Sequence, residues 1–241
     1  MLQAIDRTDV FTTLEAARKS GQIALLVGPT GIGKSDILRQ CASAVNETAP
    51  GGQSPILLHI ADVVSTPRGL AAGLLAQLDV LWRGTARSGL AVLKSRMRTA
   101  HVSAIVVDEA HRLAANSLEF LRELHEATGV SVILAGPLRL RGQLLAKAPE
   151  LAHHVTHIHA ISAWVSPTDI LPFIKTGSDN RKRRSYWERV AIARRVARMA
   201  GGNMRRALQI LSAARREASR RHRALSAHLL DETTCQFLDA V

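Results

Sequence analysis

Eight residues near the start of the chain have the types and the spacing of a phosphate-binding loop. The segment Gly28-Pro-Thr-Gly-Ile-Gly-Lys-Ser35 fits the pattern G-x-x-x-x-G-K-[ST]. Its glycines allow backbone N–H groups to wrap around phosphate oxygens at the positively polarised start of a helix. Lys34 is then expected to reach the β- and γ-phosphates of a nucleotide, and the Ser35 hydroxyl to ligate Mg²⁺. The predicted nucleotide-binding residues of this segment are Gly28, Pro29, Thr30, Gly31, Ile32, Gly33, Lys34, Ser35 and Asp36.

A pair of acids further along the chain supplies the second part of such a site. Residues 104–107 are apolar and are followed directly by Asp108 and Glu109. Ligands bind at the carboxyl ends of parallel strands, which is where this pair is expected. An acidic pair alone is more often a solvated turn, but the phosphate loop upstream favours a hydrolytic site. Asp108 would hold Mg²⁺, directly or through water, and Glu109 would act as the general base on the attacking water.

These residues predict in-line attack of water on a γ-phosphate. ATP is favoured over GTP because the chain has no Asn-Lys-x-Asp tetrapeptide that would recognise guanine. The sequence contains no adenine motif, so the choice of base depends on the missing guanine motif alone. The predicted cofactors are therefore ATP and Mg²⁺.

The elements that must position these residues follow from the distribution of apolar residues. Short apolar runs predict strands at residues 23–27, 56–60, 104–107 and 131–134. Helical patterns lie between them, at residues 34–45, from about residue 66, at 89–99 and at 117–128. This alternation predicts an α/β fold with a parallel sheet flanked by helices. After about Val165 the pattern is helical only, so we expect a core over residues 1–165 and a small, strongly basic, all-helical domain over residues 166–241.

Length and composition exclude several classes of protein. With 241 residues, the chain is too short for the two motor domains of a helicase but long enough for one sizeable core. A hydrophobic fraction of 46% excludes a disordered chain, and no apolar run approaches the ~20 residues that a membrane span needs. The first residues lack the pattern of an export signal, and the two cysteines, Cys41 and Cys235, have no metal-ligand spacing. These features predict a cytoplasmic protein that does not contact a membrane.

Positive charge is concentrated in one part of the chain. The formal net charge is +12, and residues 181–223 hold fifteen Lys and Arg residues against two Glu residues. Such a basic segment attached to a nearly neutral body favours a polyanionic partner, because neutralised phosphates release counterions. The alternative is an arginine-rich helical surface that is simply solvated. We therefore predict a nucleic-acid partner.

The order of these features resembles that of an AAA+ ATPase. A phosphate loop, an acidic strand end and a helical C-terminal part follow one another over nearly the whole chain. Residues 105–113, 118–130 and 132–136 are similar to the ATPases of DNA transposition, exemplified by the B protein of bacteriophage Mu and by TniB and TnsC of bacterial transposons. The resemblance implies a P-loop core with a helical lid, which forms homo-oligomeric rings or filaments on duplex DNA with ATP. It also implies target-site selection and activation of a partner transposase.

Three family positions are matched unevenly. Residues 202–208 resemble the sensor 2 segment, which implies that Arg205, or alternatively Arg206, approaches the γ-phosphate as a catalytic residue. At sensor 1, relatives commonly have Asn or Thr, whereas this chain has Gly136-Pro137. Relatives often have an arginine finger before the fifth strand, where this chain has residues 151–154 without an arginine. The resemblance therefore implies hydrolysis that is slow or depends on a partner. Other candidates for the finger are Arg139, Arg141 and Lys147.

Two groups of basic residues are candidate DNA contacts, and the sequence leaves both open. The resemblance favours the core, whereas charge density favours the lid. Contacts to the DNA backbone predict weak sequence preference and strong salt dependence in either case. The core candidates are Arg68, Arg83, Arg87, Lys94, Arg96 and Arg98. The lid candidates are Arg181, Lys182, Arg183, Arg184, Arg194, Arg195 and Arg198.

Other interpretations of the same residues follow from these patterns. The chain is alternatively a replication-initiator or secretion-type AAA+ ATPase, or a nucleotide-gated DNA-binding scaffold with little hydrolysis. The four histidines at positions 153, 154, 157 and 159 suggest a metal site, but an edge strand or interface is favoured because no cysteine lies nearby. The three tryptophans are expected in cores or at domain junctions rather than as base-stacking platforms.

Overall fold

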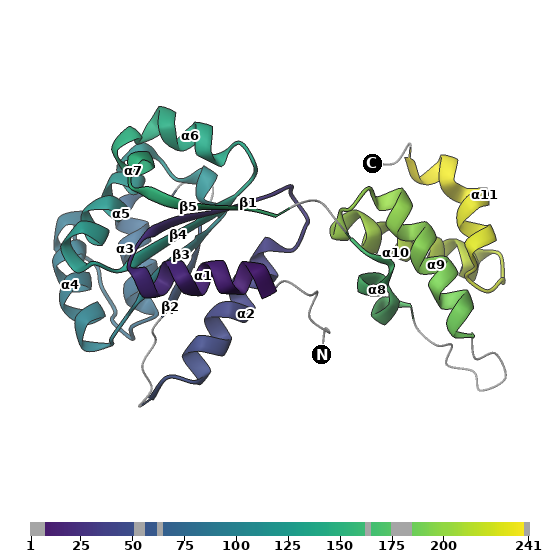
Figure 1. The fold of residues 1–241 in the computed structure, drawn as a ribbon, viewed down its shortest axis with the longest axis horizontal. Helices are drawn as coiled ribbons and strands as arrows, with labels where there is room; N and C mark the ends of the chain where they lie inside the picture. The colour runs from purple at the N-terminus through teal and green to yellow at the C-terminus, as the bar shows by residue number, and fades with distance from the viewer. Residues whose placement is uncertain (1–7, 51–55, 62–64, 162–164, 175–184, 239–241) are drawn as a thin grey trace. The chain divides into compact units, whose positions relative to one another are not determined.

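The computed structural model describes residues 8–50, 56–61, 65–161, 165–174 and 185–238 (Figure 1). The chain divides into two compact units. The first, called the sheet unit here, comprises Arg7–Gly28 and Lys34–Ile161. The second, called the helical unit, comprises Met1–Asp6, Pro29–Gly33 and Ser162–Val241.

Within the described ranges, the sheet unit contains one sheet of five parallel strands. They are β1 (Ile23–Val27), β2 (Ile56–Ile60), β3 (Ala104–Asp108), β4 (Ser131–Gly136) and β5 (Val155–Ala160). Their order across the sheet is β2-β3-β4-β1-β5, and every neighbouring pair is parallel. The residues of β1, β3 and β4 are all buried, as expected for inner strands covered on both faces. The predicted parallel α/β fold is therefore confirmed.

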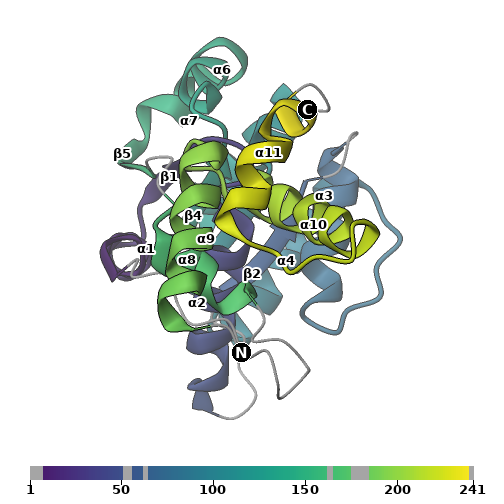
Figure 2. The same ribbon diagram turned by 90° about the vertical axis from the view of Figure 1, so that its right-hand side faces the viewer.

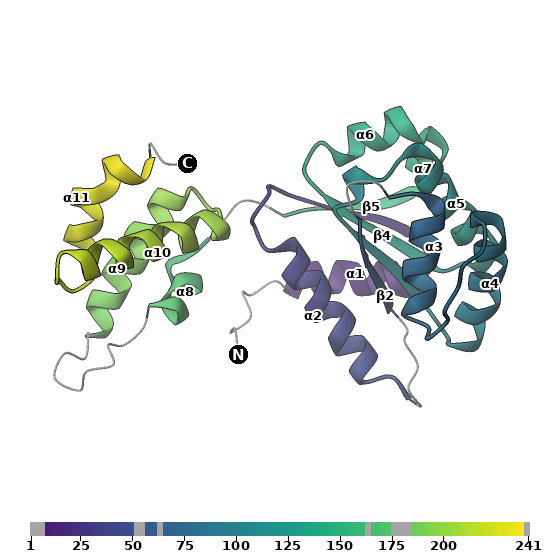
Figure 3. The ribbon, with the colours of Figure 1, turned by 180° about the vertical axis from the view of Figure 1, so that it is seen from behind.

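Helices cover both faces of this sheet. On one face, α1 (Thr8–Ser20) and α2 (Lys34–Glu47) pack against alternate strand residues such as Leu26, Val106 and Ile133. The other face carries α3 (Pro67–Ala76), α4 (Ala86–Thr99), α5 (Ala115–Thr128), α6 (Leu140–Lys147) and α7 (Pro149–His153). Figure 3, turned by 180° from Figure 1, shows the helices of this second face. Successive strand residues point to opposite faces, so each strand contributes to both cores.

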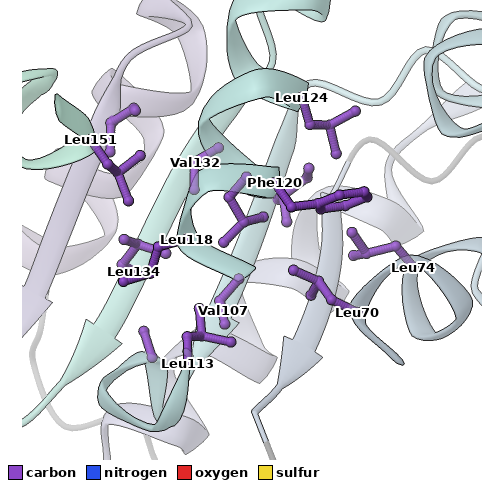
Figure 4. Packing of buried hydrophobic residues seen from close by; sticks show 14 of the residues in the cluster. Leu70, Leu74, Val107, Leu113, Leu118, Phe120, Leu124, Val132, Leu134 and Leu151 are labelled. Atoms are coloured by element: carbon purple, nitrogen blue, oxygen red, sulfur yellow. The ribbon is translucent and has the colours of Figure 1, made fainter. Parts of the chain in front are cut away.

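The larger core lies between the sheet and α3, α5 and α7. Figure 4 shows its packing, in which Phe120 of α5 lies near Leu70 and Leu74 of α3. Leu118 and Leu134 are likewise buried there, at 1% and 0% exposure. Burial of such side chains contributes ~1.5–3 kcal/mol each relative to full exposure. This core therefore fixes the helices that follow β2 and β3.

Local signals in the sequence set several helix ends. Thr66 caps α3 by accepting a hydrogen bond from the Gly69 N–H, and Pro67 occupies the first turn. Thr85 and Ser88 form a reciprocal capping box at the start of α4. Gly129 ends α5 in the left-handed conformation, with φ of 68°.

The helical unit has its own apolar core. It contains α8 (Pro167–Ile170), the 3₁₀ turn η3 (Leu171–Phe173), α9 (Tyr186–Ala200), α10 (Met204–Arg220) and α11 (Ala227–Leu238). Figure 2 shows these helices in green to yellow. Ile192, Val196 and Leu211 are among its buried residues. Ser185 and Glu188 form a capping box at the start of α9, and Asn203 caps α10.

Two aromatic residues of α9 differ from the sequence-based expectation. In the sequence Tyr186 shares one helical face with Val190, Ala193 and Ala197, and Trp187 is expected in a core or at a domain junction. Tyr186 is 60% exposed and Trp187 is 74% exposed within the described residues. The two rings instead pack edge to face, with centroids 5.5 Å apart. The first turn of α9 extends beyond the apolar core, which explains the exposure of both rings.

No helix in the described ranges is long and apolar enough to cross a membrane.

Candidate nucleotide site

The predicted phosphate loop connects the end of β1 to the start of α2. Gly31 and Gly33 have φ values of 82° and 91°, which side-chain-bearing residues rarely adopt. Gly28 is needed for a different reason, because a Cβ there would lie 2.9 Å from the backbone oxygen of Ile161. At these three positions a residue with a side chain would therefore have a strained backbone or a steric clash.

Lys34 lies at the first position of α2 and is 7% exposed. Its Nζ donates a hydrogen bond to the Gly28 backbone oxygen at 2.8 Å. Burial of an ammonium group is costly unless it is compensated by hydrogen bonds or negative charge. The phosphates of a nucleotide would supply that charge, so Lys34 fits its expected role.

The two residues after Lys34 lie in different environments. Ser35 is half-buried in the first turn of α2. Asp36 is exposed, and its Oδ1 accepts a hydrogen bond from Arg39 at 2.9 Å on the helix surface. The Asp36 carboxylate is thus engaged with Arg39 on the surface of α2.

Asp108 and Glu109 lie at the carboxyl end of β3 and differ in their exposure to solvent. Asp108 is 3% exposed, and its Oδ1 accepts a hydrogen bond from the Glu109 N–H at 2.9 Å. Glu109 has φ 53° and ψ 33°, a left-handed conformation that costs a non-glycine residue ~1–2 kcal/mol. This backbone turns the chain out of the strand, and the Glu109 side chain is 32% exposed. One acid is therefore buried as a ligand should be, and the next is accessible to water.

The sheet brings the acids and the start of the phosphate loop to the same edge. Strand β4 lies between β1 and β3, so all three carboxyl ends are adjacent. The Gly28 N–H donates to the Gly136 backbone oxygen at 3.2 Å, which joins the end of β1 to the end of β4. Gly28, Lys34, Asp108 and Glu109 thus gather from two distant parts of the sequence.

The sensor 1 position has no polar side chain. Gly136 ends β4, and the Pro137 backbone oxygen accepts a hydrogen bond from the Leu140 N–H at 2.8 Å as α6 begins. A Cβ at Gly136 would lie 3.1 Å from the Leu140 side chain. The end of β4 therefore packs against Leu140, and neither residue 136 nor residue 137 has a polar side chain.

The three candidates for the arginine finger differ in whether their side chains are hydrogen-bonded or exposed. Lys147 donates hydrogen bonds to the backbone oxygens of His111 and Leu113, at 3.3 and 3.2 Å. Arg139 and Arg141 are exposed at the start of α6. Lys147 is thus occupied within its own chain, and the two arginines are accessible.

Arg205 lies in the first turn of α10, and the helical unit includes the loop segment Pro29–Gly33. The Arg205 N–H donates to the Gly31 backbone oxygen at 3.1 Å. The Asn203 side-chain Nδ2 donates to the Thr30 backbone oxygen at 2.7 Å. Within this unit, the start of α10 therefore contacts the middle of the phosphate loop. The contact made by Asn203 was not expected, although Asn before a helix is a recognisable capping signal.

The six basic core candidates for DNA contact lie on α3, on α4 and in the connection between these helices. Within the described residues none of the six forms an ion pair, and all except the half-buried Lys94 are exposed. Several lid arginines are paired, for example Arg195 with Asp231 and Arg221 with Glu217. Arg194 and Arg198 are exposed on α9. Four lid candidates, Arg181, Lys182, Arg183 and Arg184, lie outside the described residues.

The histidines around β5 make separate local contacts. His157 Nε2 lies 2.7 Å from Gln22 Oε1, and His159 Nδ1 lies 3.2 Å from Thr13 Oγ1. His154 Nε2 lies 3.8 Å from Glu126 Oε1. Among the residues that the structure describes, no three His, Cys, Asp or Glu side chains form a group that would hold a metal ion.

A phosphate loop after β1 and an acidic pair after β3, in a parallel sheet with this strand order, define a P-loop fold of the AAA+ type. A family model described as "AAA domain" matches residues 17–144, which is more than half of the chain. The chain therefore belongs to this AAA domain family. No curated protein sequence matches the chain.

Several solved structures share the fold. The ORC2 protein of Aeropyrum pernix in its ADP form has a TM-score of 0.68 at 16% identity, with 96% of this chain and 68% of that chain covered. The same protein in ADPNP–ADP complexes gives 0.71 at 14% identity, with 98% and 69% covered. The RuvB Holliday junction branch migration motor of Thermotoga maritima gives 0.59 at 18% identity, with 94% and 66% covered. The likeness shows the fold, and this chain spans about two thirds of each of those chains.

Proposed function

We propose that this protein is a Mg²⁺-dependent ATPase that binds duplex DNA and assembles on it into homo-oligomers. The observation that carries the proposal is the gathering of buried Lys34, buried Asp108 and accessible Glu109 at one edge of the sheet. In this proposal residues 1–165 form the ATPase core and residues 166–241 form a lid. The ADP and ADPNP named for the ORC2 structures support a nucleotide ligand for this fold.

The proposed reaction assigns one role to each residue. Backbone N–H groups of the phosphate loop and the Lys34 ammonium bind and orient the phosphates. The Ser35 hydroxyl and the Asp108 carboxylate would hold Mg²⁺. The ion would stabilise the negative charge that develops on the phosphate oxygens in the transition state. Glu109 accepts a proton from the attacking water, and Arg205 approaches the γ-phosphate from the lid.

Two substitutions test the hydrolytic proposal. Lys34→Ala should weaken ATP binding about tenfold to a hundredfold, because it removes charge-assisted hydrogen bonds worth ~1.5–3 kcal/mol. Glu109→Gln should keep ATP affinity but reduce phosphate release by a factor of ~10²–10⁴, since it removes the general base. The control is Arg39→Ala, which removes an exposed cation from α2 outside the site.

Phosphate release and nucleotide affinity are measured for all four proteins, with and without duplex DNA. If wild type and Glu109→Gln release phosphate equally slowly, the ATPase proposal is wrong and the scaffold alternative is preferred. That alternative has a specific support, because Gly136-Pro137 offers no polar side chain to position water.

The specific role that we propose is selection of transposition target sites and activation of a partner transposase. It is supported by the resemblance of residues 105–113, 118–130 and 132–136 to transposition ATPases. The second candidate is a replication-initiator type of ATPase, supported by the likeness to the ORC2 protein. Both roles place the protein on DNA inside the cell, in the cytoplasm.

Electron microscopy of negatively stained samples separates these two candidates. Wild-type protein is mixed with long duplex DNA and a non-hydrolysable ATP analogue, and with DNA alone. Continuous coats whose length follows the DNA, formed only with nucleotide, support the transposition type. Isolated particles with nucleotide present favour the initiator type. Lys34→Ala is the control and should form no coats.

A further inference from the structure

The chain turns sharply after Glu109 and places one imidazole beside its carboxylate. The 3₁₀ turn η2 (Ala110–Arg112) follows Glu109 directly. His111 Nδ1 lies 3.3 Å from Glu109 Oε2, and the His111 side chain is 19% exposed. Within the part of the chain that the structure describes, this buried nitrogen has no hydrogen-bond partner of good alignment. A buried polar atom without a bond is unusual, so its direction toward Glu109 requires an explanation.

Two sets of hydrogen bonds fix the backbone of the turn that carries this imidazole. The Arg112 N–H donates to the Glu109 backbone oxygen at 2.9 Å, which closes the turn. Lys147 of α6 donates to the backbone oxygens of His111 and Leu113, on either side of Arg112. Since the turn is tied to Glu109 and to α6, the backbone of His111 is held close to Glu109.

A carboxylate acting as general base needs one oxygen directed at the water, and its other oxygen is available for a fixed contact. His111 lies beside Oε2, which leaves Oε1 for the water. Because a carboxylate only accepts hydrogen bonds, the contact requires the tautomer with the proton on Nδ1. The Nδ1–Oε2 separation of 3.3 Å is within reach of such a bond.

We propose that His111 is a positioning residue for Glu109: its Nδ1–H holds Oε2 and thereby directs Oε1 toward the attacking water. This inference deepens the proposed ATPase function and depends on it. His111 contacts neither the water nor the nucleotide in this scheme. It acts only through the orientation of Glu109.

The charge state of the imidazole agrees with such a role. Burial lowers the pKa of His111 below its usual 6.5, and Arg112, Arg139 and Lys147 lower it further, whereas Glu109 opposes them. At neutral pH the imidazole is therefore uncharged. A neutral N–H donor orients the carboxylate, whereas a cation would withdraw more of its basicity.

Substitution of His111 tests this geometry. His111→Ala should lower kcat about fivefold to tenfold, the loss expected for one hydrogen bond, with the affinity for ATP unchanged. His111→Asn keeps an N–H donor near the Nδ1 position and should restore kcat to within about twofold. Arg112→Ala is the matched control, since it changes the neighbouring exposed residue of the same turn and should leave kcat unchanged. Thermal unfolding of each variant verifies that it is folded.

A double-mutant cycle separates positioning from a general loss of structure. In the Glu109→Gln background, His111→Ala should cause no further loss, because there is no general base left to orient. Equal kcat for wild type and His111→Ala, or equal losses in the two backgrounds, would overturn the inference while the ATPase proposal stands. Equal phosphate release by wild type and Glu109→Gln would instead overturn both.

Discussion

Asp108 and Glu109 are adjacent in the sequence but lie in different environments. The left-handed conformation of Glu109 separates them, since it ends β3 and directs the second acid outward. The sequence predicted the identity of both residues from their position after an apolar run. It did not predict the left-handed backbone, because Glu has no preference for that conformation. The contact between His111 and Glu109 was missed for the same reason, since it depends on this turn.

Cys41 provides a prediction at the same scale. Its side chain lies in the core between α2 and the sheet, and burial raises the pKa of its thiol to about 12. The thiolate is the reactive form, so its fraction at pH 8 is very small and Cys41 should resist alkylation in the folded protein. Labelling with iodoacetamide is followed by mass spectrometry in a Cys235→Ser variant, where Cys41 is the single cysteine.

The control for this experiment is the same variant in concentrated urea, where Cys41 should be labelled fully. Because the pKa is raised, reactivity in the folded state should increase as the pH rises toward 12. Rapid labelling of the native protein at pH 8 would show that α2 does not cover Cys41 as described.

At the scale of elements, the sequence predicted those with a strong apolar pattern and missed the short or weakly patterned ones. The strand predicted at residues 23–27 coincides with β1, and that at 104–107 extends one residue further in the structure. Helix α1 was missed because its first half is rich in β-branched residues, which favour strands, and its burial in the sheet unit outweighs this preference. Helices α6 and α7, of 8 and 5 residues, are too short to show a helical period.

Two helix-ending glycines give a matched prediction at this scale. Gly21 after α1 and Gly129 after α5 have similar left-handed φ values of 63° and 68°. A Cβ at Gly129 meets nothing within 4 Å, whereas a Cβ at Gly21 would lie 2.8 Å from the Gly129 backbone oxygen. Gly129→Ala should therefore cost about 1 kcal/mol of unfolding free energy, from conformation alone. Gly21→Ala should cost about 1–3 kcal/mol more, because backbone must also move.

Urea denaturation of both variants and of wild type measures these differences in unfolding free energy. Each variant serves as the control for the other, since both change glycine to alanine at a helix end. Equal destabilisation would mean that the close approach between the two turns is absent in solution.

At the scale of the whole molecule, the fold was predictable and the biological role was not. Alternation of strands and helices predicts the parallel α/β core, and the resemblance carried by the phosphate loop, the acidic strand end and the helical C-terminal part implies the AAA+ type. Proteins only 14–18% identical share that fold. Partner choice depends on surface residues, where many sequences serve the same fold. The two candidate DNA surfaces illustrate this, because charge density favoured the lid whereas the resemblance favoured the core, and the sequence left both open.

Within the described residues none of the six basic core candidates forms an ion pair, whereas several lid arginines do. We therefore expect the core surface on α3 and α4 to contact DNA. Arg83→Ala with Arg87→Ala should weaken duplex binding and reduce the slope of log affinity against log salt by ~0.9 for each phosphate that is no longer neutralised. Arg194→Ala with Arg198→Ala is the matched control, since it removes two exposed arginines from α9 of the helical unit. Fluorescence anisotropy with labelled duplexes of unrelated sequence, over a range of salt concentrations, measures both properties. A reduced slope for the α9 variant alone would move the DNA surface to the lid.

The left-handed backbone at Glu109 also bears on how this protein would change over evolutionary time. A glycine there would remove the conformational cost of ~1–2 kcal/mol, and an asparagine would reduce it. Because most proteins have only ~5–15 kcal/mol of net stability, such a replacement would be a substantial gain. In a lineage that no longer needed turnover, replacement of this glutamate would therefore be tolerated and would leave a more stable, inactive protein. In the proposed ATPase, Glu109 is thus a residue at which selection for stability and selection for catalysis act in opposite directions.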